Sequence, residues 1–344
     1  MTEIFKTRSG GIQEGDSLAF MKNHVCDNSI DLIVTSPPFA LLRKKDYGNE
    51  AQENYVEWFK NFGKEFYRIL KPTGSLVIDI GGSWIPSQPT RSLYHFELLI
   101  MLCREIHFNL AQEFYWWNPS KLPTPAEWVN VRRIRVKDAV NSVYWLSKNA
   151  WPKASNRRIL FPYSDSMKEL LKNGYQAKVR PSGHNISKKF SIDNKAAIPP
   201  NLLAIPNTES NSYYLRFCQK NHYKIHPARF PATLPEFFIR MLTNENDFVL
   251  DPFAGSCVVG EVCERLNRKW ICCELEHEYL LGAIGRFKEE AKREVINEDM
   301  SYKIFNPSSL WGINDESPIL EDGGKERHLK SKRLIEFKEN GEKK

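Results

Sequence analysis

Residues 247–260 restrict the fold of this chain more than any other stretch. They read Asp-Phe-Val-Leu-Asp-Pro-Phe-Ala-Gly-Ser-Cys-Val-Val-Gly, which predicts a buried strand, a tight turn and a helix that runs to about Arg268. In such a βα unit a small ligand can approach the backbone at Gly255 and be held by the helix N-terminus. The next predicted strand, 270–274, ends in Glu274, at the place where Rossmann-like folds hold a ribose by its hydroxyls.

The turn does not have the residues of a phosphate-binding loop. Gly255 and Gly260 have the required spacing, but Glu261 and Val262 stand where Lys and Ser or Thr would be needed. Asp251 places a carboxylate at the turn, which disfavours a phosphate and favours a cationic ligand.

A second constrained segment, Thr35-Ser-Pro-Pro-Phe39, follows the apolar run 29–34. Pro37 and Pro38 end that predicted strand, so the loop lies at a strand's carboxyl end and its carbonyl oxygens have no competing N–H groups beside them. Ser36 and the Pro37 carbonyl can accept both hydrogens of an exocyclic base amine, and Phe39 offers a face for stacking. A strand followed by a plain Pro-Pro turn would look the same in isolation.

Strand and helix patterns alternate along the first half of the chain. Residues 55–70 and 93–107 have helical apolar spacing, and apolar strands are expected at 75–82, 111–117 and 141–147. This βαβαβ order predicts an α/β fold with a parallel, doubly wound sheet.

Charge is spread unevenly along the chain. The net charge is +7, but residues 119–229 carry 20 Lys and Arg against 6 Asp and Glu, a balance of +14, which leaves −7 for the remainder. The middle third is therefore expected to face a polyanion. Residues 151–222 have no sustained periodicity and many prolines, which fits a loop-rich DNA-contact lobe or a solvated insertion.

Other features exclude some classes of protein. No apolar run approaches the roughly 20 residues of a spanning helix, and the N-terminal residues lack the apolar core of a signal peptide, so we expect a cytoplasmic protein without a membrane partner. Seven irregularly spaced cysteines indicate reduced thiols and no metal site. His226, beside a proline, is expected to be structural.

The two motifs in this order resemble the S-adenosylmethionine-dependent DNA amino-methyltransferases of the permuted β group. Ser-Pro-Pro-Phe is most similar to the loop of the cytosine-N4 enzymes of type II restriction–modification systems, and the similarity extends over roughly residues 10–290. The resemblance implies a Rossmann-like, seven-stranded, mostly parallel sheet with one antiparallel strand and a smaller DNA-recognition lobe. Two positions depart from the family: Cys257 replaces a common glycine, and Phe230 stands where many relatives have lysine.

The resemblance also implies roles for individual residues. Asp251 would bind the amino group of the cofactor's methionine part, Glu274 the ribose hydroxyls and Asp16 the adenine amine, although the local sequence around Asp16 favours an ordinary turn or helix cap. The implied catalytic residues are Ser36, Pro37, Pro38 and Phe39. The implied S-adenosyl-L-methionine site comprises Asp16, Thr35, Asp251, Pro252, Phe253, Gly255, Ser256 and Glu274, and the expected DNA contacts are Arg43, Lys44, Arg132, Arg133, Arg135, Arg180 and Lys188.

The expected organisation is a catalytic half (1–150), a target-recognition lobe (151–222), a cofactor half (223–295) and a partly disordered extension (296–344). The expected activity is methyl transfer to N4 of a flipped-out cytosine in double-stranded DNA, with a cognate restriction endonuclease as a genetic partner only. Adenine-N6 transfer is the alternative within the class, and a catalytically silent DNA-binding protein is the alternative outside it. The sequence does not fix the oligomeric state, and a monomer is slightly favoured.

Overall fold

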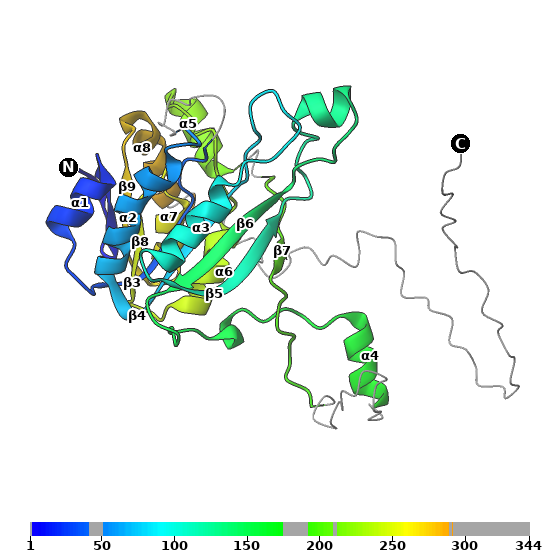
Figure 1. The fold of residues 1–344 in the computed structure, drawn as a ribbon. Helices are drawn as coiled ribbons and strands as arrows, with labels where there is room; N and C mark the ends of the chain where they lie inside the picture. The colour runs from blue at the N-terminus through cyan, green and yellow to red at the C-terminus, as the bar shows by residue number, and fades with distance from the viewer. Residues whose placement is uncertain (1, 41–50, 175–191, 209–211, 289–290, 292–344) are drawn as a thin grey trace, which may run out of the picture. The chain divides into compact units, whose positions relative to one another are not determined.

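The structure is a computed structural model that describes residues 2–40, 51–174, 192–208, 212–288 and 291 (Figure 1). All of them belong to the first of two compact units, Met1–Pro307. The second unit, Ser308–Lys344, lies outside the described residues, and so does the whole expected extension 296–344.

One nine-stranded sheet forms the centre of this unit, in the order β1-β2-β9-β8-β3-β4-β6-β5-β7. Strands β2, β9, β8, β3 and β4 are mutually parallel, whereas β6 runs antiparallel to both β4 and β5. The strands are β1 (Thr2–Lys6), β2 (Gly10–Glu14), β3 (Ile30–Thr35), β4 (Leu70–Ile80), β5 (Asn109–Trp117), β6 (Val140–Ser147), β7 (Leu202–Ala204), β8 (Phe248–Asp251) and β9 (Lys269–Glu274).

The predicted fold class is confirmed, but the predicted number of seven strands is wrong. The first additional strand, β1, pairs antiparallel with β2 at one edge, and the second, β7, pairs parallel with β5 at the other. β1 has no buried side chain and β7 has only three residues, so neither produces the apolar pattern by which a strand is recognised.

Helices cover both faces of the sheet because the strand side chains alternate in direction (Figure 1). In β3, Ile30 and Ile33 join the core under α1, α2 and α3, whereas Leu32 and Val34 join the core under α6 and α7. No described helix combines the length and apolar composition needed to cross a bilayer. The helices on the first face are α1 (Ser17–His24), α2 (Tyr55–Ile69) and α3 (Tyr94–Arg104), and α6 (Thr233–Leu242) and α7 (Val258–Arg265) cover the second.

Residues 151–222 contain regular structure that their sequence does not indicate. The Ser164 hydroxyl caps α4 (Asp165–Asn173), and β7 extends the main sheet. Helix α5 (Tyr213–Asn221) packs beside α8 (His277–Ala283) and the 3₁₀ turn η4 (Ile284–Phe287), and a second 3₁₀ turn, η2, spans Asn156–Arg158. The division of the chain into the four expected parts stays a prediction.

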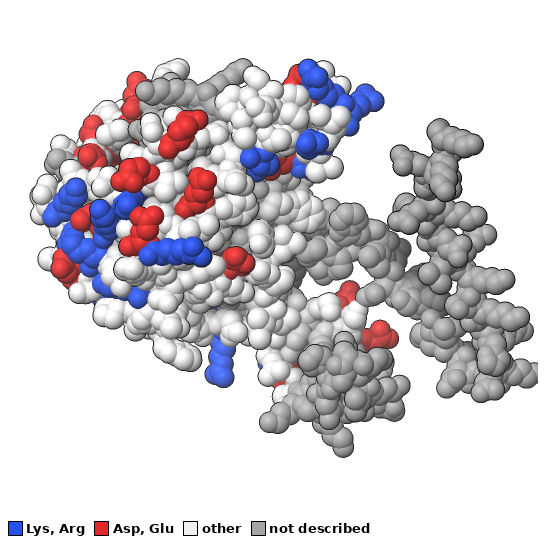
Figure 2. Space-filling model, in the orientation of Figure 1, with Lys and Arg blue, Asp and Glu red and all other residues white. Residues whose placement is uncertain are grey.

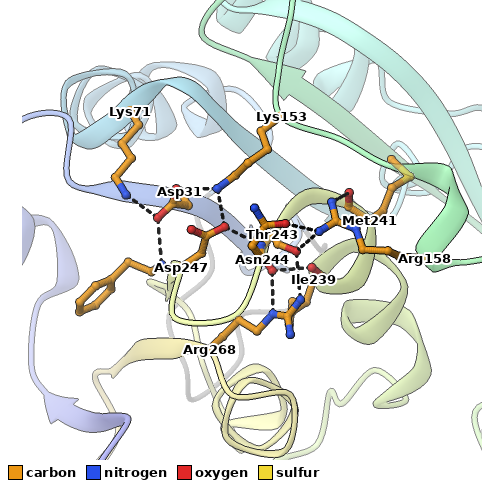
Figure 3. A network of polar contacts seen from close by, with 11 residues as sticks. Asp31, Lys71, Lys153, Arg158, Ile239, Met241, Thr243, Asn244, Asp247 and Arg268 are labelled. Atoms are coloured by element: carbon orange, nitrogen blue, oxygen red, sulfur yellow. Dashed lines mark hydrogen bonds and ion pairs between the residues drawn. The ribbon is translucent and has the colours of Figure 1, made fainter.

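A polar network joins the amino ends of β3 and β8 to the segment that follows β6 (Figure 3). Asp31, which is 4% exposed, accepts from Lys71 at 2.6 Å, from Lys153 at 3.2 Å and from the Phe248 N–H at 3.0 Å. Lys153 also pairs with Asp247. The network thus links strands that are remote in sequence at their amino ends. The predicted site lies at the opposite, carboxyl ends of the same strands.

Candidate active site

The two predicted motifs meet at the carboxyl ends of adjacent strands. β3 ends at Thr35 and β8 ends at Asp251, and the Thr35 hydroxyl donates to Asp251 Oδ1 at 2.6 Å. In open parallel sheets, ligands bind at the carboxyl ends of the strands. The hydrogen bond therefore fixes the Ser-Pro-Pro-Phe loop against the turn after β8.

The turn is held from three sides. The Phe253 N–H donates to Asp251 Oδ1 at 3.1 Å, and the Phe253 ring packs on Phe62 of α2 with centroids 4.9 Å apart. On the helix side, Arg286 donates to the Ser256 carbonyl at 2.7 Å and to its hydroxyl at 3.1 Å. Pro252 and Phe253 thus lie in the turn that follows β8, while Ser256 is already engaged by a neighbouring side chain.

Gly255 requires its lack of a side chain. Its φ is +52°, and a Cβ there would lie 3.0 Å from the His226 ring. The Gly255 N–H donates to Glu274 Oε2 at 2.7 Å, which joins the turn to the end of β9. His226 is buried against Tyr279, and burial lowers its pKa to about 4, so the ring is neutral at physiological pH. These contacts fit the structural role expected for His226.

Glu274 ends β9 and pairs with Glu14 at the end of the neighbouring strand β2, two residues before Asp16. The Gly15 N–H donates to the Glu274 carbonyl at 2.9 Å, and the N–H groups of Leu275 and Glu276 donate to Glu274 Oε1, both at 3.0 Å. Asp16 caps α1 by accepting from the Leu18 N–H at 2.8 Å. The helix-cap reading of Asp16 is confirmed, and its place just past the end of β2, next to the end of β9, is compatible with the adenine role.

Burial makes the two carboxylates of this turn weak acids. Desolvation raises the pKa of Asp251 to about 7 and also raises that of Glu274. Among the described residues neither forms an ion pair with Lys, Arg or His. A ligand with a cationic group next to Asp251 and hydroxyl donors next to Glu274 would offset the cost of burying these charges.

Ser36 contacts an acid that sequence reasoning missed. Its hydroxyl donates to Asp79 Oδ2 at 3.1 Å, and Asn141 Nδ2 donates to Asp79 Oδ1 at 3.1 Å. Asp79 is 5% exposed, and desolvation raises its pKa to about 6. The sequence did contain a signal for Asp79, a charged residue inside the apolar strand Leu-Val-Ile-Asp-Ile. A carboxylate is rarely buried unless it has a partner or a function.

Phe39 forms one wall of a large cavity beside these residues. A Cβ on Gly81 would lie 2.5 Å from Phe39 Cε2, so the ring rests directly on the backbone at the end of β4. The cavity has a volume of about 840 Å³, and Trp84, Trp128 and Arg132 also line it. Its size is within the range of small-molecule sites.

The remaining predicted DNA contacts are distributed between two places. Arg132, Arg133 and Arg135 belong to the connection between β5 and β6, which includes the π-helical turn η1 (Glu127–Val131). Figure 2 shows Lys and Arg side chains gathered where Figure 1 draws this turn. The other four predicted contacts lie outside the described residues: Arg43, Lys44, Arg180 and Lys188.

Comparisons with known proteins agree with this arrangement. The family model for DNA methylases of the N6/N4 type matches residues 30–284. The type II methyltransferase M.PvuII from Proteus hauseri is 51% identical over 309 residues, which cover 89% of this chain and 92% of that protein.

Solved structures have the same architecture. The cytosine-N4-specific PvuII DNA methyltransferase superposes with a TM-score of 0.69 at 44% identity, covering 88% of this chain and 94% of the other. The protein TTHA0409 from Thermus thermophilus, solved with S-adenosyl-L-methionine, gives a TM-score of 0.50 at 19% identity over 83% of this chain and 96% of the other. The second likeness concerns the fold alone.

Proposed function

Because this chain belongs to the N6/N4 DNA methylase family, we propose that it transfers a methyl group from S-adenosylmethionine to the N4 amine of a cytosine flipped out of double-stranded DNA. The observation that carries the proposal is the 2.6 Å hydrogen bond between Thr35 and Asp251, which joins the base-binding loop to the cofactor turn. The cytosine-N4 specificity printed for the PvuII enzyme supports the choice of base.

The residues of the turn fit this cofactor. Asp251 would hold its amino group and Glu274 its ribose hydroxyls, because both are buried carboxylates without a cationic partner in the described part of the chain. Gly255 leaves room for close approach. When bound, the cofactor supplies an electrophilic methyl group on a sulfonium centre.

The loop residues orient the amine. The N4 lone pair is delocalised into the ring, so the amine must be held with its hydrogens on fixed acceptors. Ser36 and the Pro37 carbonyl provide those acceptors, and Phe39 stacks on the base at the cavity wall. Alignment of this kind can lower a barrier by up to ~7–11 kcal/mol.

Asp79 gives the released proton a destination. With its pKa near 6 it is ionised at neutral pH and accepts from the Ser36 hydroxyl. Ser36 can therefore take a proton from the methylated amine while its own hydroxyl proton moves to Asp79. The Asn141 amide holds the second Asp79 oxygen and keeps the carboxylate in place.

The product distinguishes the proposal from its alternatives. DNA from cells that express the protein should be digested and analysed by mass spectrometry, and the modified positions mapped by sequencing. N4-methylcytosine at one sequence is the expected result; N6-methyladenine would favour the adenine alternative, and no modified base would favour a silent DNA-binding protein. The Ser36→Ala variant should lose modification yet retain cofactor affinity.

We also propose the cellular context. The type II names of relatives support a role in protecting host DNA in the cytoplasm from an endonuclease of the same site. That endonuclease would be a genetic partner without a physical complex, and the methyltransferase would act as a monomer. Gel filtration with light scattering tests the last point.

A further inference from the structure

The connection between β5 and β6, residues 118–139, leaves the sheet beside the reacting groups. Trp117 and Val140 pair at its root, and Asn141, the next residue, bonds Asp79. The same connection supplies one wall of the cavity that Phe39 closes on the other side.

The connection is braced rather than loose. The Ile134 N–H donates to the Trp128 carbonyl and the Asp138 N–H to the Thr124 carbonyl, both at 2.9 Å. Asp138 forms an ion pair with Arg91, and Arg135 donates twice to the Pro89 carbonyl, at 3.1 and 2.8 Å. Its exposed side chains are therefore presented by a fixed backbone.

Those exposed side chains are unusually apolar for a cationic segment. Residues 118–139 carry five Lys and Arg against two Asp and Glu, a balance of +3. Four aliphatic residues on the same segment are nonetheless exposed by 48–85%: Leu122, Val131, Ile134 and Val136. Solvation explains the cations but not a group of exposed aliphatic residues.

We infer that residues 118–139 enter the duplex at the target base pair, with the aliphatic residues filling the space that the flipped base leaves and Arg133 binding a flanking phosphate. This inference rests on the proposed function. Extruding a base breaks its stacking and pairing, and apolar wedges between base steps are a known way to stabilise such a distorted duplex. A duplex whose base lies in the cavity next to Ser36 is the partner that this cationic and apolar wall fits.

The test uses the site that sequencing identifies, on two duplexes. One has a normally paired target cytosine, and in the other the cytosine lies opposite an abasic position, so that extrusion costs little. Val131→Ser combined with Val136→Ser should lower the methylation rate at least about tenfold on the paired duplex and less than about threefold on the abasic one. The control variant, Ile100→Ser, removes a half-exposed aliphatic side chain on α3 and should leave both rates unchanged.

The outcomes separate the inference from the proposed function. Equal losses on both duplexes, or no loss on either, would overturn the wedge while wild-type methylation upholds the proposed function. Failure of the wild-type protein to methylate either duplex would overturn the function itself. Arg133→Ala provides an independent measurement: a phosphate contact there should lower the log–log salt slope of binding by about 0.9, and an unchanged slope would contradict the cationic part of the inference.

Discussion

Among the single residues of this site, Cys257 has a backbone conformation that is unusual for a residue with a side chain. Cys257 is a non-glycine residue in the left-handed region, with φ +53° and ψ +41°, at the N-cap of α7. It replaces the glycine that the resemblance led us to expect, and its side chain is fully buried. A residue with a Cβ thus occupies a left-handed backbone position, and burial of the thiol offsets part of that cost.

The left-handed conformation of Cys257 predicts that alanine and glycine substitutions will have the reverse of their usual order of stability in a helix. Cys257→Ala keeps the Cβ in the left-handed region and loses the thiol, whereas Cys257→Gly loses both the strain and the thiol. The glycine variant should therefore be the more stable by about 1 kcal/mol, although glycine is normally the weaker helix residue. Urea unfolding of the two variants measures the difference, and an alanine variant of equal or greater stability would contradict the argument.

The raised pKa of Asp251 predicts that cofactor binding releases protons. In the protein without cofactor the Asp251 carboxyl has a pKa of about 7. When the cofactor is bound, its amino group should keep that carboxyl ionised. Below pH 7 the carboxyl must lose a proton when the cofactor binds. The contribution of Asp251 to cofactor affinity should therefore rise with pH and level off above about pH 7. Calorimetric titrations at pH 6 in buffers of different ionisation enthalpy should detect up to about one proton released. Asp251→Asn should abolish this release; an unchanged proton count would assign it to another group.

Asp79 predicts the pH dependence of turnover. Protonation of Asp79, with its pKa near 6, removes the acceptor for the Ser36 hydroxyl, so the rate should fall as pH drops below about 6. Asp79→Asn should lower kcat by about 10²-fold and flatten this profile, with little change in cofactor affinity. Asp27→Asn, an exposed acid beside Arg68, serves as the control. An Asp79→Asn variant with the wild-type pH profile would exclude the proton role.

Elements were predictable where burial imposes a period. Helix α2 was expected at 55–70 and is Tyr55–Ile69, and the predicted strand at 270–274 is β9 with one further residue. Residues 71–74 were expected to separate a helix from a strand, but they interrupt the pairing within β4, between the Ile30–Leu70 and Leu32–Ser75 partners. β7 was not predictable because three residues in a proline-rich stretch carry no period.

The residues of the site, too, were predictable only where a local sequence pattern marks them. Ser36, Asp251, Gly255 and Glu274 stand in local motifs, whose backbone requirements are visible in one short stretch of sequence. Asp79 and Asn141 act through a hydrogen bond between residues 62 positions apart, and the cavity is built by segments that only the fold brings together. Pairing of that kind leaves no local pattern.

At the element scale, the Asp31 network predicts acid lability. Burial acts to raise the pKa of Asp31, but hydrogen bonds from Lys71, the Phe248 N–H and Lys153 outweigh it and lower the pKa below 3.8. Since the folded pKa lies below the unfolded one, this stabilisation is present above about pH 4 and is lost as pH falls through the folded value. Asp31→Asn should lower the unfolding free energy at pH 7 by about 2 kcal/mol, discounted because Lys71 and Lys153 are partly exposed.

Denaturant unfolding at pH 7 and pH 3 measures this effect. The wild-type protein and Asp31→Asn should differ at pH 7, and the difference should be smaller at pH 3, because it shrinks as pH falls from about 4 through the folded pKa of Asp31. Lys60→Met, which breaks an exposed ion pair with Glu105 on the outer helices, should cost little at either pH. A constant difference between Asp31→Asn and wild type across both pH values would show that packing, not charge, is the cause.

Over the whole molecule, charge and catalysis are separated along the chain. The middle third carries the +14 balance, while the catalytic and cofactor strands belong to the part with −7. Base recognition by residues 151–222 stays a prediction, and α4, one of the helices described in that stretch, carries the exposed lysines Lys168 and Lys172.

The separation predicts where salt sensitivity resides. Lys172→Ala, in α4, should lower the magnitude of the log–log salt slope of DNA binding by about 0.9 if it contacts a phosphate, and weaken cognate and scrambled duplexes alike. Lys64→Ala, an equally charged change on α2, should leave the slope unchanged. Fluorescence anisotropy at several salt concentrations measures both, and equal slopes for Lys172→Ala and wild type would remove α4 from the phosphate-binding surface.

The position of β8 between β3 and β9 has a consequence for synthesis on the ribosome. β3 ends at Thr35, yet its partner β8 begins at Phe248, so about 210 residues are translated before the centre of the sheet can close. At 5–20 residues per second this takes roughly 10 to 40 s, during which one edge of β3 has no strand to pair with. The nascent chain therefore depends on α2, α3, β4 and β6 to cover its apolar residues, and the predicted cofactor site is complete only after Glu274 has been translated.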